Sequence, residues 1–72
     1  MKLYEFEFIN HNDKSGYIFL VASHEKEAED MARDALNTRD VLFKSIKLII
    51  KFFEVAEEVK SGVYEVIYPS IE

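Results

Sequence analysis

The feature that most constrains the fold is the apolar segment IKLIIKFFEVAEEV, residues 46–59. If it formed a helix, the chain would be a helical bundle, whereas a strand here would add to a sheet. As a helix it would end its apolar stripe at Glu57 and spread apolar residues over most of its circumference. As a strand its isoleucine and phenylalanine side chains suit a pleated surface. We therefore predict a strand from Ser45 to Val55, with a helix as the alternative.

Two more strand patterns lie near the N-terminus. KLYEFEFIN (residues 2–10) alternates aromatic and acidic side chains with a period of two. YIFLVA (residues 17–22) is apolar throughout, as in a central strand that is covered on both faces. Between them, HNDKSG has turn chemistry, because Asn12, Asp13 and Gly16 tolerate left-handed backbone. We predict an antiparallel hairpin.

The segment SHEKEAEDMARDALN has the pattern of a helix. Ser23 is the expected N-cap and Asn37 the expected stop. Glu29 and Arg33 have the i, i+4 spacing of an ion pair. Because the apolar stripe is mostly alanine, the helix can lie close to a sheet. The stripe consists of Ala28, Met31, Ala32, Ala35 and Leu36.

We predict a last strand from Val63 to Tyr68, which Pro69 ends because proline cannot donate to the ladder. The tripeptide KSG precedes this strand, as it precedes YIFLVA, so we expect a second hairpin here. The order strand, strand, helix, strand, strand predicts one α+β domain over residues 1–72. Its architecture would be a four-stranded antiparallel sheet with one helix packed on one face.

One helix covers only one face of such a sheet. We expect the other face to expose an apolar patch that marks an interface with another chain. The alternative is that the loop DVLFK, residues 40–44, covers this face within the monomer. The patch would include some of Ile18, Leu20, Ile49 and Phe53, or their neighbours along the strands.

The composition restricts the partners. Fourteen Asp and Glu against nine Lys and Arg give a net charge of −5. This balance disfavours a nucleic-acid backbone and suits a protein partner with a basic surface. Met1 is followed by no basic-then-apolar signal segment, and no apolar run is long enough to span a membrane. We therefore expect a cytoplasmic protein.

We expect no enzyme activity, cofactor or metal site. There is no cysteine, and two glycines cannot build a phosphate loop. His11 and His24 are expected to be exposed rather than metal-bound. Glu5 and Glu7 share a strand face, which we expect to be solvated rather than catalytic.

The aromatic residues of the strands have two interpretations. Tyr17, Phe19, Tyr64 and Tyr68 could stack on the bases of a single strand. We favour core packing instead, because the neighbouring lysines are few. These are Lys14, Lys47, Lys51 and Lys60.

The outer side of the predicted helix is acidic, and we call these residues the acidic helix surface. Such a surface is usually only solvated, but it is also a candidate for docking on a basic groove of a partner. The candidate aromatic anchors are Phe53, Tyr64 and Tyr68. The alternative is a homo-oligomeric small-ligand or regulatory domain that pairs through the sheet face or edge. The acidic helix surface consists of Glu25, Glu27, Glu29, Asp30, Asp34 and Asp40.

The run GYIFLVASHEKEAEDMARDAL, in which a strand leads into a capped, alanine-striped helix, is followed later by SGVYEVIY. In this order of elements, and in size and acidity, the chain is similar to small phage-encoded anti-CRISPR proteins. The resemblance implies a stoichiometric inhibitor that binds a host nuclease or defence protein through charge and shape. It transfers no residue role, because that class shares no motif.

Overall fold

The computed structural model describes residues 1–56 and 58–69, without the side chains of residues 50–53. It confirms the predicted order of elements and shows that segment 46–59 begins as a strand. Within the described residues, no helix is long and apolar enough to cross a membrane. The elements are β1 (Lys2–Ile9), β2 (Ser15–Ala22), α1 (Glu25–Thr38), β3 (Ser45–Glu54) and β4 (Gly62–Ile67).

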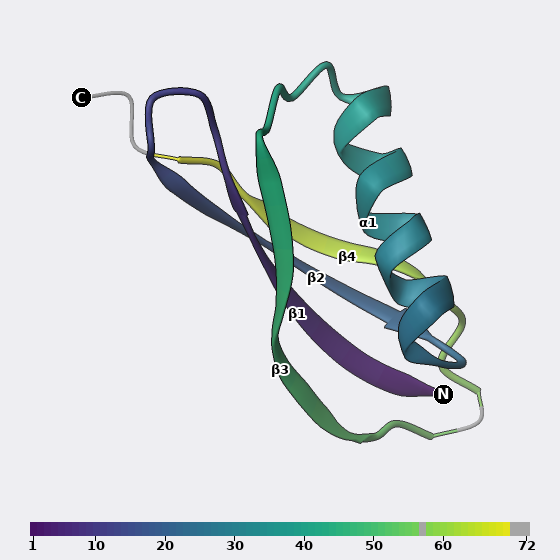
Figure 1. Ribbon diagram of the computed structural model, residues 1–72. Coiled ribbons are helices and arrows are strands. Elements are labelled where there is room, and N and C mark those ends of the chain that lie inside the picture. The colour runs from purple at the N-terminus through teal and green to yellow at the C-terminus, as the bar shows by residue number, and fades with distance from the viewer. Residues whose placement is uncertain (57, 70–72) are drawn as a thin grey trace.

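The four strands form one antiparallel sheet in the order β3-β1-β2-β4, and α1 lies on one of its faces (Figure 1). The predicted second hairpin is wrong, because β3 pairs with β1 and β4 with β2, at opposite edges of the sheet. The KSG tripeptide lies where a strand begins, at β2 and again at β4, but it does not specify which strand of the sheet this new strand pairs with. Adding one strand to each side of the first hairpin keeps β1 and β2 central, under α1.

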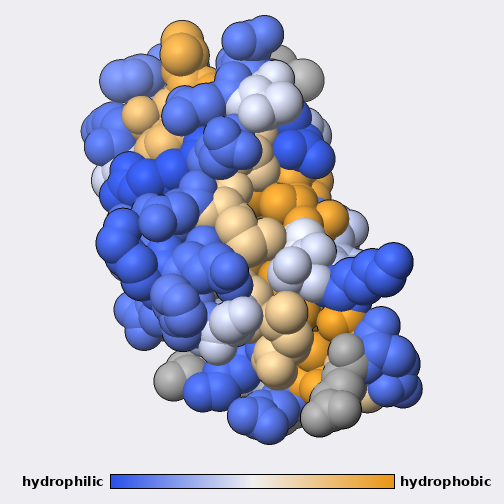
Figure 2. Space-filling view, turned by 90° about the vertical axis from the view of Figure 1, so that its right-hand side faces the viewer, coloured by the Kyte–Doolittle hydropathy of each residue, from blue (hydrophilic) through white to orange (hydrophobic). Residues whose placement is uncertain are grey.

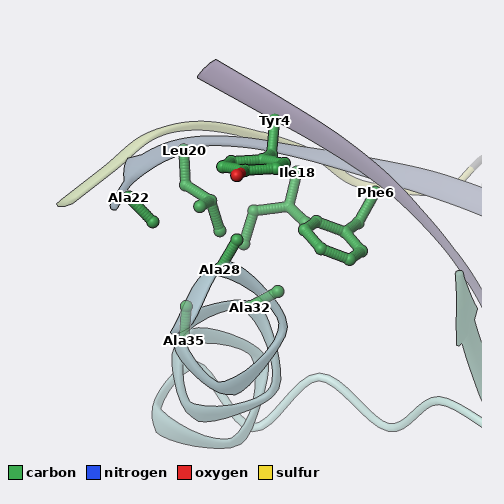
Figure 3. Packing of buried hydrophobic residues seen from close by; sticks show 8 residues of the cluster. All are labelled: Tyr4, Phe6, Ile18, Leu20, Ala22, Ala28, Ala32 and Ala35. Atoms are coloured by element: carbon green, nitrogen blue, oxygen red, sulfur yellow. The ribbon is translucent and has the colours of Figure 1, made fainter. Parts of the chain in front are cut away.

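The core lies between α1 and the two central strands. Tyr4, Phe6 and Phe8 of β1 are buried on this side, because alternate residues of a strand face the same way. Figure 3 shows three alanines of α1 directed at the sheet, and all three are buried, as predicted. Small side chains let the helix backbone approach closely. The core cluster comprises Tyr4, Phe6, Ile18, Leu20, Ala22, Ala28, Ala32 and Ala35.

The helix begins one residue later than the sequence predicts. His24, not Ser23, is the N-cap: its backbone is extended, and its Nδ1 accepts a hydrogen bond from the Glu27 N–H at 3.2 Å. The Glu27 carboxylate in turn accepts from the Ser23 N–H at 2.6 Å. The two bonds resemble a capping box, except that Glu27 accepts from the residue before the N-cap and not from the N-cap itself. The imidazole takes the place expected for the serine hydroxyl.

Gly16 has a different role from the one predicted. The left-handed residue of the first turn is Asp13, with φ 62°, whereas Gly16 belongs to β2 and is buried. A Cβ at Gly16 would overlap the Phe8 ring and lie 2.8 Å from the Ile67 carbonyl oxygen. Glycine is required here for space, not for backbone conformation.

Both edge strands have shifts of register with their neighbours, and these shifts change which side chains face α1. In β4, Val63 lies opposite Leu20 and Glu65 opposite Phe19, so that Tyr64 is an extra residue between them. This β-bulge lets Val63 and Val66 face α1 although they are three residues apart. It explains why the sequence of β4 does not alternate simply.

Candidate interaction surface

The face of the sheet away from α1 carries a definite pattern of side chains, and we call it the outer sheet face. Its residues alternate with the buried ones along each strand, so they point away from the helix. The strand register then shows which of them are neighbours across the sheet. Among the described side chains, the outer sheet face comprises Leu3, Glu5, Glu7, Ile9, Tyr17, Phe19, Val21, Lys47, Gly62, Glu65 and Ile67. Val21 is buried although it lies on this face, so the face is covered at that end.

Phe19 is the centre of this face. It lies opposite Glu5 of β1 on one side and Glu65 of β4 on the other. Its side chain is half-buried, as is that of Glu5, while Glu65 is exposed. The ring is therefore flanked by a carboxylate on each side, in one row that runs across three strands.

The next row is similar but more nearly neutral. Tyr17 lies between Glu7 of β1 and Ile67 of β4. The Lys47 ammonium group of β3 is 3.6 Å from the Glu7 carboxylate, whose side chain is only 16% exposed. An ion pair with one partner this far from water retains more of its attraction than a fully exposed one. Lys47 thus compensates Glu7, whereas no ion pair to Glu5 or Glu65 occurs among the described side chains.

The apolar patch that we expected on this face consists of other residues than predicted. Ile18 and Leu20 are fully buried under α1, so their neighbours Tyr17 and Phe19 face outward instead. Ile49 is exposed on β3, and the side chain of Phe53 lies outside the described residues. The outer sheet face is therefore aromatic and acidic in the two rows of Phe19 and Tyr17, with the apolar residues Leu3, Ile9 and Val21 beyond these rows.

The loop of residues 40–44 does not cover this face. It connects the end of α1 to β3 at one end of the sheet (Figure 1), where the Lys44 N–H donates to the Ile9 carbonyl oxygen at 2.8 Å. Leu42 in this loop is 75% exposed. The loop therefore lies at an end of the sheet, between α1 and β3, and not over Phe19.

The structure divides the acidic helix surface among several roles. Asp30 pairs with Lys26 at 2.9 Å, and Glu29 pairs with Arg33 at 3.0 Å, as the spacing predicts. Glu27 accepts a hydrogen bond from the Ser23 N–H at the start of α1. Asp40 follows the helix in a left-handed conformation, with φ 57°. Glu25 and Asp34 are exposed, and no ion pair to either occurs among the described residues.

The two tyrosines of the C-terminal part are not core residues, so that prediction is wrong for them. Tyr64 is 58% and Tyr68 55% exposed. Tyr64 sits at the bulge of β4, where its hydroxyl donates to the Lys60 carbonyl oxygen at 2.8 Å. They lie on and just beyond an edge strand, whereas the acidic helix surface lies on α1 and the loop after it.

The histidines are exposed, as expected, although His24 also caps α1. Among the described residues no group of three or more His, Asp or Glu side chains is close enough to hold a metal ion, and no pocket is present. Of the lysines considered for base stacking, only Lys47 has its described side chain on the outer sheet face, next to Glu7. The sequence did not identify the row of Phe19, because only the strand order reveals that Glu65 lies beside it.

We compared the chain with protein-family models, with curated proteins and with solved structures, and found no match.

Proposed function

We propose that this chain is a protein-interaction module whose outer sheet face binds a basic segment of a partner protein. The observation that carries the proposal is the position of the partly exposed Phe19 between Glu5 and Glu65 on the face away from α1. The module binds rather than catalyses.

The chemistry of this row suits a lysine or arginine side chain. A cation above an aromatic ring is attracted to the ring face, and carboxylates on either side add charge-assisted hydrogen bonds. Neighbouring strands are about 4.8 Å apart, so Glu5 and Glu65 are separated by roughly 10 Å with the Phe19 ring between them. One guanidinium or ammonium group fits in this space.

The same face disfavours a nucleic-acid strand. Tyr17 and Phe19 offer ring surfaces, but among the described side chains of this face the acids Glu5, Glu7 and Glu65 outnumber the one lysine, Lys47. Phosphate groups would be repelled, because binding them requires Lys and Arg beside the stacking rings. A protein partner is therefore favoured.

A more specific form of the proposal is a stoichiometric inhibitor of a host nuclease or defence protein. Its support is the net charge of −5, the acidic and aromatic outer sheet face, and the resemblance in element order to small anti-CRISPR proteins. An acidic face is complementary to the basic groove in which a nuclease holds its nucleic acid. The module would then exclude the nucleic acid from that groove.

The test compares two variants with the same change in charge. Glu5→Gln with Glu65→Gln removes two acids from the outer sheet face, and Asp30→Asn with Asp34→Asn removes two from the acidic helix surface. The probe is a short peptide of alternating arginine and serine, and its affinity is measured by calorimetry. We expect the sheet variant to bind about tenfold more weakly and the helix variant to bind nearly as the original chain does.

The opposite result, with loss of binding only in the helix variant, would transfer the site to the acidic helix surface. Amide chemical shifts of the labelled protein provide the second measurement. Titration with the same peptide should perturb Glu5, Phe19 and Glu65 more than Asp30 and Asp34. Equal, weak perturbation over both faces would mean that only net charge attracts the peptide.

The inhibitor form has its own test. A tagged chain should capture one protein from a host lysate in a one-to-one ratio, and nucleic acid should compete with the capture. The Glu5→Gln, Glu65→Gln variant should lose this capture. A captured protein that nucleic acid does not displace would leave the module without an inhibitory role in that complex.

A further inference from the structure

The two edges of the sheet differ in how well they are protected. The sequence of β3 includes Lys47 and Lys51, and the strand departs from regular register with β1 at two places. Lysines and irregularities discourage the addition of another strand. β4 has one charged residue, Glu65, and one irregularity, at Tyr64. The edge of β4 is therefore the more open one.

Exposed apolar area also gathers at β4. Among the described residues, Tyr64, Ile67 and Tyr68 are large hydrophobic side chains more than 40% exposed. On the α1 side of the strand, Val63 and Val66 are only partly buried against the core. Figure 2, which views the molecule from the side of α1, shows a band of apolar surface beside the hydrophilic region.

We propose that β4 pairs with β4 of a second copy, antiparallel, about a two-fold axis between Tyr64 and Glu65. All six residues of the strand then pair, Gly62 with Ile67, Val63 with Val66 and Tyr64 with Glu65 of the second copy. The two sheets become one continuous sheet of eight strands, with both α1 helices on the same side. This inference concerns the edge of the sheet rather than its outer face; the two share Glu65 and Ile67, but the inference does not depend on the proposed function.

The register follows from which face each residue occupies. Val63 and Val66 lie opposite Leu20 and Ile18, on the α1 side. In the proposed register Val63 meets Val66 of the second copy, so apolar residues of the same face pair. A shift by one residue would set Val63 opposite Glu65 or Ile67, which lie on the outer sheet face. Residues directly opposite each other in a pleated sheet point to the same face, so the shifted register is excluded.

We call the boundary between the two β4 strands the junction. On the outer face of the sheet, the side chains that meet at the junction are complementary as well. Gly62 lies opposite Val21 and Ile67 opposite Tyr17, so both belong to the outer side of β4. The register sets Gly62 against Ile67 of the second copy. A Cβ at Gly62 would have no atom within 4 Å, so the exposed Ile67 side chain of the other copy has room to lie there. The extra residue Tyr64 occurs on both strands and is matched by the symmetry.

The interface consists of one short strand from each copy, so we expect a reversible dimer with a dissociation constant on the order of micromolar. Sedimentation at chain concentrations from about 1 μM to about 1 mM should show a shift from the mass of one chain to twice that mass. The variant Ile67→Lys should weaken the dimer by about tenfold or more, because it brings lysines to the junction. Leu42→Lys makes the same change in an exposed loop and should leave the dimer unaltered.

Cross-linking tests the register directly, since the chain has no cysteine. A mixture of the Val63→Cys and Val66→Cys variants should form a disulfide-linked dimer on mild oxidation. Each variant alone should cross-link much less, because positions 63 and 66 of opposite copies are neighbours and like positions are not. Circular dichroism of each variant confirms that it is folded.

A chain that stays monomeric at the highest concentration would overturn the proposal. So would a dimer that Ile67→Lys leaves intact, or cross-linking of either cysteine variant alone as efficiently as the mixture. If the chain is monomeric yet a partner's extended segment protects the amides of β4 from exchange, the occupant of this edge is that segment and not a second copy.

Discussion

The ring of Phe8 occupies the space that a side chain at Gly16 would need. A Cβ there would overlap the ring and would lie 2.8 Å from the Ile67 carbonyl oxygen. The two residues lie opposite each other in the β1–β2 pair. At this point the hairpin and the edge strand β4 meet, so a small change of volume affects three strands.

We predict that Gly16→Ala lowers the free energy of unfolding by about 1 to 3 kcal/mol, the usual range for overpacking. Phe8→Leu alone should also destabilise the protein, because it leaves a cavity. The double variant should lose less than the sum of the two, since the shorter side chain relieves the overlap. Urea denaturation measures all three, and additive losses would show that the ring is not what excludes a larger residue.

The N-cap gives a second prediction. His24→Ala removes the acceptor of the Glu27 N–H and should cost about 0.5 to 2 kcal/mol of stability. His24→Asn should retain most of the stability, because asparagine is a good N-cap. His11→Ala is the matched control: His11 is exposed in the first turn, and its removal should change the thermal midpoint little. Equal losses at both histidines would argue against a capping role.

The sequence predicts the elements well, because each depends on local patterns. The alternation in KLYEFEFIN predicts a strand and its buried face. The alanine stripe predicts a helix and the side of it that packs on the sheet. Strand pairing is different. Whether β4 joins β3 or β2 depends on which arrangement covers the central strands best, and no single segment carries that information.

The residues of the candidate site also divide into those that local sequence patterns can place and those that only the strand pairing places. Glu5 and Phe19 belong to neighbouring strands of a hairpin, so the sequence can place them near each other. Glu65 reaches the same row only through the β2–β4 pairing and the bulge at Tyr64. The exposure of Tyr64 and Tyr68 has the same origin: the sequence does not reveal that their strand lies at an edge.

The first turn is tied to the start of β3 by an ion pair, which gives a third prediction. The Asp13 carboxylate accepts a hydrogen bond from the Lys44 ammonium group. This bond, with the charge of Lys44, lowers the pKa of Asp13 below its usual value of 3.8. Since the folded pKa is the lower one, the pair stabilises the fold above pH 3.8, and the stabilisation is lost as pH falls through that value towards the folded pKa.

Asp13→Asn should therefore reduce stability at neutral pH and have no effect at strongly acidic pH. Asparagine is the suitable replacement, because it also tolerates the left-handed backbone at this position. Lys44→Met should remove the same pH-dependent part, and added salt should weaken it in the original chain. Thermal midpoints across the acidic range measure the effect. A loss that persists unchanged at the lowest pH would mean that the asparagine itself, and not the charge, is responsible.

Glu65 connects the two proposed surfaces, so one substitution can test both. It flanks Phe19 on the outer sheet face, and in the proposed dimer it lies beside the two-fold axis near Glu65 of the second copy. Glu65→Gln should weaken binding of the basic peptide, because the row loses one of its two carboxylates. The same change should strengthen the dimer by about 0.5 to 1 kcal/mol, or about two- to fivefold, because two like charges no longer approach each other.

Glu5→Gln is the matched control: Glu5 lies in the same row but on β1, away from the junction, and should weaken peptide binding without altering the dimer. Peptide calorimetry and sedimentation of the same samples give both readings, and a change of the two equilibria in the same direction would contradict the assignment of separate surfaces.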